Sequence, residues 1–184
     1  ALTNHQLQRV FYGSDGASAV EIALKMSFHY WRNLGFPNKN KFVCLQNSYH
    51  GETLGALGVT DIPLFSDTYD ALIQKPFLCK SPVFNSSQNS SHTSDEAIEI
   101  AIQDLRNIFK EHYQEIASLI IEPMVQCAAG MQMYDAKYLK AVRQLCTEYN
   151  ILLIADEIAV GFGRTGSFFA CEHASIWPDL MTLS

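Results

Sequence analysis

Residues 151–157, with the sequence ILLIADE, decide the fold of this chain. Ile151 to Ala155 are apolar at every position, which is typical of a strand buried on both faces of a parallel sheet. Two carboxylates, Asp156 and Glu157, follow this strand without a spacer. Open α/β sheets bind their ligands just beyond the carboxyl ends of such strands, so this stretch predicts both a fold class and the position of a site.

The segments on both sides of this strand alternate between strand-like runs and helix-period patterns. This alternation predicts an α/β fold, a mostly parallel sheet with flanking helices. Thr93 and Glu96 form a capping-box signature at the start of a predicted helix over about 95–113. The preceding stretch, 82–93, is rich in Ser and Asn, and we expect a surface loop there. Strands are predicted at 10–12, 42–45, 119–121, 151–155 and 179–184, and further helices at 16–35, 138–149 and within 49–58.

The composition excludes several classes of protein. The chain has 184 residues, a formal net charge of -6, 48% hydrophobic residues and 17% charged residues. This balance excludes an intrinsically disordered chain, a collagen and a basic nucleic-acid binder. The apolar runs fall far short of the roughly 18 residues that cross a bilayer, and the N-terminus has no apolar signal core. We therefore expect a cytoplasmic protein.

The five cysteines are scattered, without a Cys-x-x-Cys pair or a Cys/His cluster. Their odd number and spacing favour free, buried thiols in a reducing compartment over a disulfide framework or a zinc site. They are Cys44, Cys79, Cys127, Cys146 and Cys171.

The first of three notable strand-to-helix junctions contains Gly16, Ala17 and Ser18. Free N–H groups at the start of a helix can bind a phosphate, and we call these three residues the phosphate cradle. Gly16 allows close approach of the backbone, and Ser18 adds a hydroxyl. The pattern matches neither the dinucleotide fingerprint nor the P-loop, which argues against nicotinamide and nucleotide cofactors.

The other two junctions contain an aromatic ring and a carboxylate. Tyr49 offers a face for a ligand ring, and a packed loop aromatic is the alternative. Asp156 must be solvated or paired with a positive group, because burial of an isolated charge is costly. A protonated pyridine nitrogen is one such group, and capping of the next turn is the alternative. A phosphate cradle, a stacking ring and an anion for a ring nitrogen are together what pyridoxal phosphate requires.

Several segments resemble the class III, or omega, aminotransferases. Residues 152–166, LLIADEIAVGFGRTG, resemble the signature segment of that family. The resemblance spans about residues 9–184. Five further segments resemble, within this family, the branch that acts in biotin synthesis. These are 11–26 (FYGSDGASAVEIALKM), 30–31 (YW), 47–55 (NSYHGETLG), 121–131 (IEPMVQCAAGM) and 169–173 (FACEH).

The resemblance implies a fold, a cofactor and substrates. The fold is the large domain of a fold type I pyridoxal-phosphate transferase, and the cofactor is pyridoxal phosphate. S-adenosylmethionine would donate the amino group to 8-amino-7-oxononanoate, giving 7,8-diaminononanoate, and the enzyme would be a homodimer. Another class III aminotransferase with a different amine donor, and a non-catalytic relative, are the alternatives.

The resemblance also implies roles for single residues. Asp156 matches the aspartate that pairs with the pyridinium nitrogen, and Tyr49 matches the tyrosine that stacks near the cofactor and touches substrate. Ile158 would pack on the opposite face of the ring. Gly16 and Ala17 match the phosphate-binding pair, which is commonly Gly-Ser in the family, so that Ser18 would replace the missing hydroxyl.

Two further residues are candidates for substrate binding. Glu52 stands near the substrate, where the nearest relatives often have Asp. Arg164 matches an arginine near the active site, and an ion pair with Glu172 is the structural alternative. Glu122 and Gln126 follow a strand end and are expected to support the site without acting in catalysis.

The family's catalytic lysine is expected outside this sequence. It lies roughly thirty residues after the pyridinium aspartate, which places it just after Ser184. Neither Lys25 nor Lys140 can replace it, because both lie on predicted helices away from that position. Residues 1–184 are therefore expected to be a partial large domain, truncated before the lysine, without the small domain and inactive alone.

Overall fold

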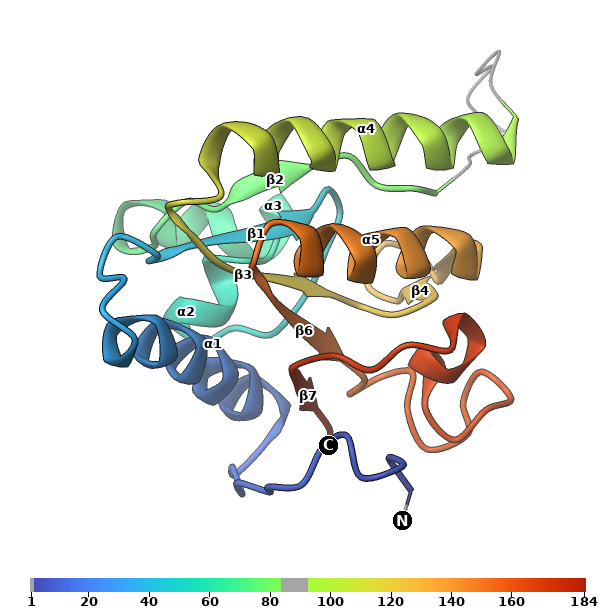
Figure 1. Ribbon diagram of the computed structural model, residues 1–184, viewed down its shortest axis with the longest axis horizontal. Helices are drawn as coiled ribbons and strands as arrows, with labels where there is room; N and C mark the ends of the chain where they lie inside the picture. Colours follow the sequence, from blue (N-terminus) through green and yellow to red (C-terminus); the bar gives the residue numbers. More distant parts are fainter. Residues whose placement is uncertain (1, 84–92) are drawn as a thin grey trace.

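The computed structural model describes residues 2–83 and 93–184, so most of the predicted 82–93 loop lies outside the described residues. The described chain forms a five-stranded sheet with flanking helices and a small two-stranded sheet (Figure 1). The elements are α1 (Gly16–Asn33), β1 (Lys41–Leu45), α2 (Leu54–Leu57), α3 (Pro63–Ser66), η1 (Asp67–Leu72), β2 (Phe77–Cys79), α4 (Ser94–His112), β3 (Ile116–Ile121), β4 (Val125–Gln126), β5 (Gln132–Met133), α5 (Ala136–Glu148), β6 (Leu152–Asp156), η2 (Ala170–Ala174) and β7 (Leu180–Thr182).

The main sheet has the order β2-β1-β3-β6-β7, and all four of its strand pairs are parallel. Parallel neighbours end at the same edge of a sheet, so the polar residues that follow these strands gather there. The register pairs Ile121 with Ala155, and Asp156 with Thr182. The predicted α/β class with a mostly parallel sheet is confirmed.

Each face of the sheet has its own apolar core, because alternate side chains of a strand point to opposite faces. Leu119 and Leu153 belong to the cluster that packs against α4 and α5. Ile120 and Ile154, their sequence neighbours, belong to the cluster that packs against α1 and α2. The strands are thus buried from both sides, as their uninterrupted apolar sequence predicts.

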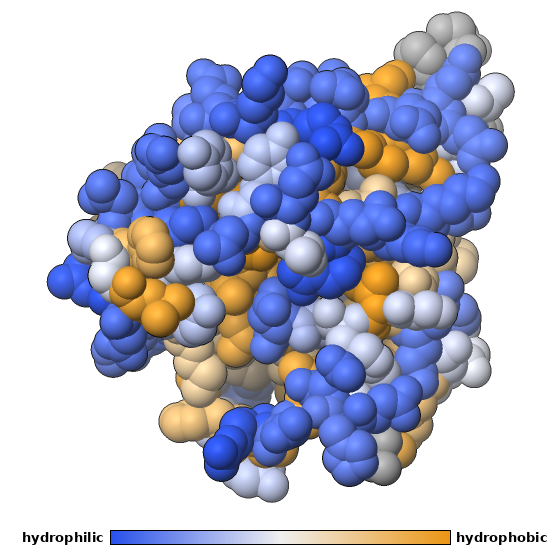
Figure 2. Space-filling view, in the orientation of Figure 1, coloured by the Kyte–Doolittle hydropathy of each residue, from blue (hydrophilic) through white to orange (hydrophobic). Residues whose placement is uncertain are grey.

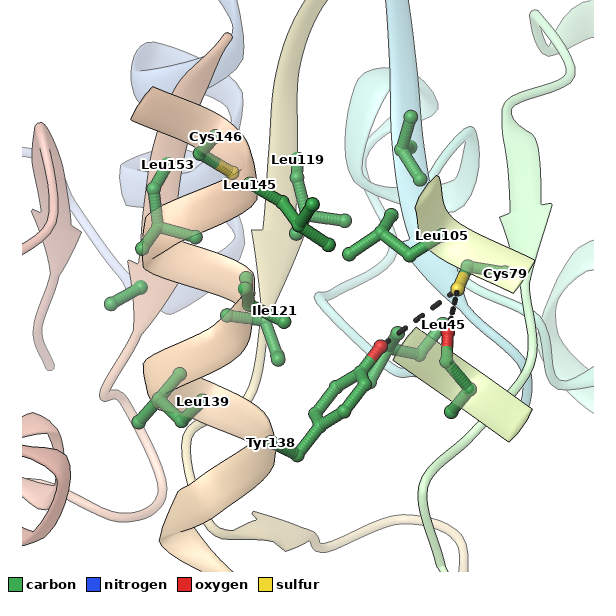
Figure 3. Close-up of a cluster of buried hydrophobic side chains, with 14 of the residues drawn as sticks. Leu45, Cys79, Leu105, Leu119, Ile121, Tyr138, Leu139, Leu145, Cys146 and Leu153 are labelled. Atoms are coloured by element: carbon green, nitrogen blue, oxygen red, sulfur yellow. Dashed lines mark hydrogen bonds between the residues drawn. The ribbon is translucent and has the colours of Figure 1, made fainter. Parts of the chain in front are cut away.

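The cluster on the α4 and α5 side contains a buried polar contact (Figure 3). The Tyr138 hydroxyl lies 3.8 Å from Sγ of Cys79. Burial raises the pKa of the Cys79 thiol, which therefore stays protonated at neutral pH. All five cysteines are free and four of them are buried, while Cys127 is partly exposed.

The outer surface of the same two helices is hydrophilic (Figure 2). The predicted capping box at the start of α4 is present, since Thr93 Oγ1 accepts the Glu96 N–H while the Glu96 carboxylate accepts the Thr93 N–H. Within the described ranges, no helix is both long enough and apolar enough to span a membrane.

The strand predicted at 10–12 is wrong. Val10, Phe11 and Tyr12 are exposed by 77%, 68% and 87%, and they pair with no described strand. Aromatic and β-branched residues favour an extended backbone, but a strand also needs a neighbour, and here the described sheet ends at β2 and β7. The helix expected within 49–58 is only the four residues of α2.

A buried lysine ties helix ends together at the opposite edge of the sheet. Nζ of Lys39 donates to the carbonyl oxygens of Tyr113, Ile116 and Asn150 at 2.8, 3.1 and 2.8 Å. It also lies 4.3 Å from the centre of the Trp31 ring. Burial lowers the pKa of Lys39 to about 8.

Candidate active site

The carboxyl edge of the sheet contains a buried acidic centre, Asp156, where β6 ends. One of its oxygens lies 2.7 Å from Nδ1 of His50. The other accepts the hydroxyl of Thr182 at 3.0 Å and the N–H of Ile158 at 3.2 Å. Since a carboxylate only accepts hydrogen bonds, His50 carries the shared proton on Nδ1. Asp156 thus caps the next turn through one oxygen and binds His50 through the other.

The loop after β1 positions His50. The side chain is buried, and its second nitrogen, Nε2, has no hydrogen-bond partner among the described residues. The His50 N–H donates to Thr60 Oγ1 at 3.0 Å. Gly51 follows with φ 118°, and a Cβ at this glycine would lie 2.7 Å from Cβ of Ala17. Only glycine therefore lets this loop contact the start of α1.

The N-terminus of α1 lies against the turn that follows Asp156. A Cβ on Gly16 would lie 3.2 Å from two side-chain carbons of Ile158, whose N–H is bonded to Asp156. Asp15 caps the helix, because its Oδ1 accepts the Ser18 N–H at 2.8 Å. The N–H of Gly16 has no hydrogen bond within the described residues. An 18-residue helix thus directs the positive end of its dipole to this region.

Tyr49 is held at both its backbone and its hydroxyl. Its N–H donates to Oε2 of Glu122 at 3.3 Å, and its hydroxyl donates to Oε1 of Glu52 at 3.1 Å. Its ring also packs 4.9 Å from the Phe65 ring, centre to centre. Burial, followed by the Glu52 carboxylate, raises the pKa of Tyr49. Burial is also the main cause that raises the pKa of Glu122.

Arg164 is exposed on the loop after β6 and forms no ion pair with any described residue. Its anticipated partner Glu172 instead accepts the Phe169 N–H at 2.8 Å, so the predicted alternative of an Arg164–Glu172 ion pair is wrong. Gln126 is buried, its amide donates to the Gln46 carbonyl at 2.8 Å and its carbonyl oxygen accepts the Ser81 hydroxyl at 2.6 Å, so its expected support of the site stays a prediction.

Two residues of the site were missed as partners in the sequence. Nothing in the local sequence connects His50 to Asp156, which is 106 positions away. Glu157 is fully buried, and its two oxygens accept the N–H groups of Ala170 and Cys171 at 2.7 and 2.8 Å. It therefore holds η2 against the end of β6 and is not available to a ligand.

The structure brings most of the predicted site residues into one neighbourhood. Gly16 contacts Ile158, and Ala17 contacts the loop that contains Tyr49. Glu52 joins the same group through the Tyr49 hydroxyl. Arg164 is the exception, because no side-chain hydrogen bond or ion pair connects it to these residues within the described chain.

This fold and this buried acidic edge define a class of protein: the chain belongs to the class III aminotransferase family, whose model matches residues 1–184. The enzymes of this family depend on pyridoxal phosphate. The chain is 47% identical over 184 residues to the adenosylmethionine-8-amino-7-oxononanoate aminotransferase of Anoxybacillus flavithermus, covering 99% of this chain and 40% of that protein. It is 40% identical to the Staphylococcus aureus protein of the same name, again covering 99% and 40%.

Solved structures agree with this assignment. The adenosylmethionine-8-amino-7-oxononanoate aminotransferase of Methanocaldococcus jannaschii matches with a TM-score of 0.83 and 31% identity, covering 96% of this chain and 38% of that one. An omega transaminase from Pseudomonas jessenii, in complex with PMP, matches with a TM-score of 0.88 and 30% identity, covering 96% and 39%. The chain thus spans about 40% of the length of the curated relatives it matches.

Proposed function

We propose that this chain forms the cofactor-binding part of a pyridoxal-phosphate aminotransferase, with the site at the carboxyl edge of the sheet. The observation that carries the proposal is the buried Asp156–His50 pair, 2.7 Å apart, beside the N-terminus of α1. An anion that holds a ring nitrogen and a helix start that holds a phosphate are complementary to the two ends of this cofactor.

The residues present fit a phosphorylated pyridine. The N–H groups of Gly16 and Ala17 and the Ser18 hydroxyl would bind the phosphate, and Asp156 would bind the pyridinium nitrogen. Tyr49 and Ile158 would cover the two faces of the ring. The buried Nε2 of His50 has no hydrogen-bond partner among the described residues, so a polar group of a ligand could bond to it beside Asp156.

The bound cofactor would supply an electron sink that stabilises negative charge on the substrate carbon. In this chain, Asp156 would keep the ring nitrogen protonated by its negative charge. His50 donates a hydrogen bond from Nδ1–H to Asp156 and Thr182 donates one from its hydroxyl, so both fix the orientation of the carboxylate. Glu52 and Arg164 would contact the substrate.

We further propose S-adenosylmethionine as the amino donor and 8-amino-7-oxononanoate as the acceptor. The names of the relatives at 47% and 40% identity support this choice. The acting enzyme would be a cytoplasmic homodimer. The catalytic lysine, just after Ser184, and the small domain would come from the remainder of a longer protein, so that residues 1–184 alone would be an inactive part of the large domain.

A second candidate is an aminotransferase of the same family with a different amine donor. The likeness to the omega transaminase from Pseudomonas jessenii, with a TM-score of 0.88, supports it. A non-catalytic relative is the third possibility, and it would bind no pyridoxal phosphate through a lysine.

The test uses the full-length protein that contains this chain, loaded with pyridoxal phosphate. Its absorbance spectrum is recorded before and after addition of S-adenosylmethionine alone, for the wild type, Asp156→Asn and Asp67→Asn. Asp67 lies on η1 and is exposed, so its variant controls for the loss of one carboxylate.

We expect S-adenosylmethionine to convert the cofactor band in the wild type and in Asp67→Asn, and at least 100-fold more slowly in Asp156→Asn. Conversion by other amines but not by S-adenosylmethionine would replace the proposed donor and favour the second candidate. Absence of any bound cofactor in the wild type would refute the aminotransferase proposal.

A further inference from the structure

A negatively charged residue lies directly before the phosphate cradle. Asp15 immediately precedes the cradle, and its Oδ1 accepts the Ser18 N–H at 2.8 Å. Its Oδ2 accepts the Ser14 hydroxyl at 3.0 Å, and that hydroxyl lies 3.1 Å from the Ser18 hydroxyl. The carboxylate therefore engages a backbone donor of the first turn and forms a network with both hydroxyls that flank it.

These contacts keep the Asp15 carboxylate charged. The Ser18 N–H is the largest cause that lowers its pKa, and the Ser18 and Ser14 hydroxyls and the Ala17 N–H act in the same direction. At neutral pH the side chain is thus an anion bonded to the Ser18 N–H, which directly follows the two N–H groups assigned to the phosphate. A phosphate is itself an anion, and like charges at one helix start repel each other.

Asp15 lies beside the proposed cofactor site. Gly16, the next residue, would place a Cβ 3.2 Å from Ile158, and Ala17 lies against Gly51 in the loop that contains His50. Gly16 and Ala17 therefore lie against the two segments that hold Asp156, while Asp15 itself is exposed. A phosphate bound at this helix start would be next to Asp15, since Gly16 and Ala17, whose N–H groups would hold it, are the next two residues of the chain.

We propose that Asp15 is a phosphate-opposing residue: its carboxylate competes with the phosphate of pyridoxal phosphate for the N-terminus of α1 and so lowers the affinity for this cofactor. This inference rests on the proposed cofactor site. It makes Asp15 a determinant of how tightly the cofactor is held, and it predicts that neutralising a single charge strengthens binding.

Substitution of Asp15 by asparagine or serine removes the negative charge but keeps the helix cap. Both residues cap helices about as well as aspartate, because their side-chain oxygen accepts the same N–H group. Asp15→Asn is also nearly isosteric. Asp135 offers a matched control, since it also caps a helix, α5, through its carboxylate, which accepts the Lys137 N–H at 2.8 Å, and α5 packs in the cluster opposite α1.

The experiment measures dissociation constants by fluorescence titration of the full-length apoprotein. The variants are Asp15→Asn, Asp15→Ser and Asp135→Asn, and the ligands are pyridoxal phosphate, pyridoxal without its phosphate, and inorganic phosphate as a competitor. Thermal unfolding of each apoprotein checks that the variants fold.

We expect both Asp15 variants to bind pyridoxal phosphate and inorganic phosphate at least fivefold more tightly than the wild type. Pyridoxal, which has no phosphate, should bind equally well in all variants, and Asp135→Asn should match the wild type. Unchanged or weaker phosphate binding in folded Asp15 variants would overturn the inference while leaving the cofactor site intact. Absence of pyridoxal-phosphate binding in every protein, the wild type included, would overturn the proposed function and this inference together.

Discussion

Glu157 offers a test of how the end of β6 is held in place. Its side chain is fully buried, and its two carboxylate oxygens accept the N–H groups of Ala170 and Cys171 at 2.7 and 2.8 Å. These N–H groups belong to the first turn of η2, which therefore depends on a residue next to Asp156. The perturbations are Glu157→Gln, which keeps one acceptor oxygen, and Glu157→Ala, which removes both.

The magnitude follows from the hydrogen bonds that each variant loses. A hydrogen bond to a charged group contributes about 1.5–3 kcal/mol, and a buried donor left without a partner costs about 1–3 kcal/mol. Glu157→Gln turns an amide N–H₂ towards one of the two backbone donors, so we expect a loss of about 2 kcal/mol in the free energy of unfolding. Glu157→Ala leaves two donors unpaired, and we expect a loss of about 4 kcal/mol.

The assay combines urea unfolding with hydrogen exchange of the peptide that contains residues 169–174. A local loss of about 2 kcal/mol corresponds to roughly 30-fold faster exchange of that peptide. Glu172→Gln is the matched control, because Glu172 is exposed and, among the described residues, its carboxylate accepts a single side-chain hydrogen bond, from the Phe169 N–H. We expect this control to cost less than about 1 kcal/mol. If Glu157→Gln is no more destabilised than Glu172→Gln, the carboxylate does not hold η2 and the reasoning fails.

Two further predictions concern backbone contact and pH. Gly51→Ala should weaken pyridoxal-phosphate binding and lower the free energy of unfolding by about 1–3 kcal/mol more than Gly130→Ala does. Both glycines have a positive φ, but of the two only Gly51 would bring a Cβ within 4 Å of another residue. Equal effects of the two substitutions would contradict this reasoning. The pKa of Lys39 in the folded chain, about 8, lies below the usual value, so the folded state binds fewer protons above that pH. The free energy of unfolding should therefore rise with pH from about 8 to about 10.4, and more steeply in the wild type than in Lys39→Met; identical pH slopes would show that Lys39 titrates normally.

The strands and long helices were predictable because their signals are local. The uninterrupted apolar sequence of β6 and the capping box of α4 each follow from neighbouring residues, and the structure contains both. The predicted strand at 10–12 failed because its local propensity lacks a partner, and pairing is a tertiary property. The residue roles drawn from the family resemblance stay predictions, although Gly16 and Ile158 do meet.

The acidic centre itself could be located but not assembled from the sequence. Asp156 was recognisable as the carboxylate that ends a buried strand, whereas its partners come from elsewhere in the chain. Thr182 reaches it only because β7 pairs in parallel with β6, in a register that places the two residues side by side. His50 reaches it because Gly51 lets the loop pass close to Ala17. The hydrogen bonds that hold Asp156 thus depend on strand register and on one glycine. A substitution far from the site that shifts either would change how the carboxylate is held without altering any polar residue of the site.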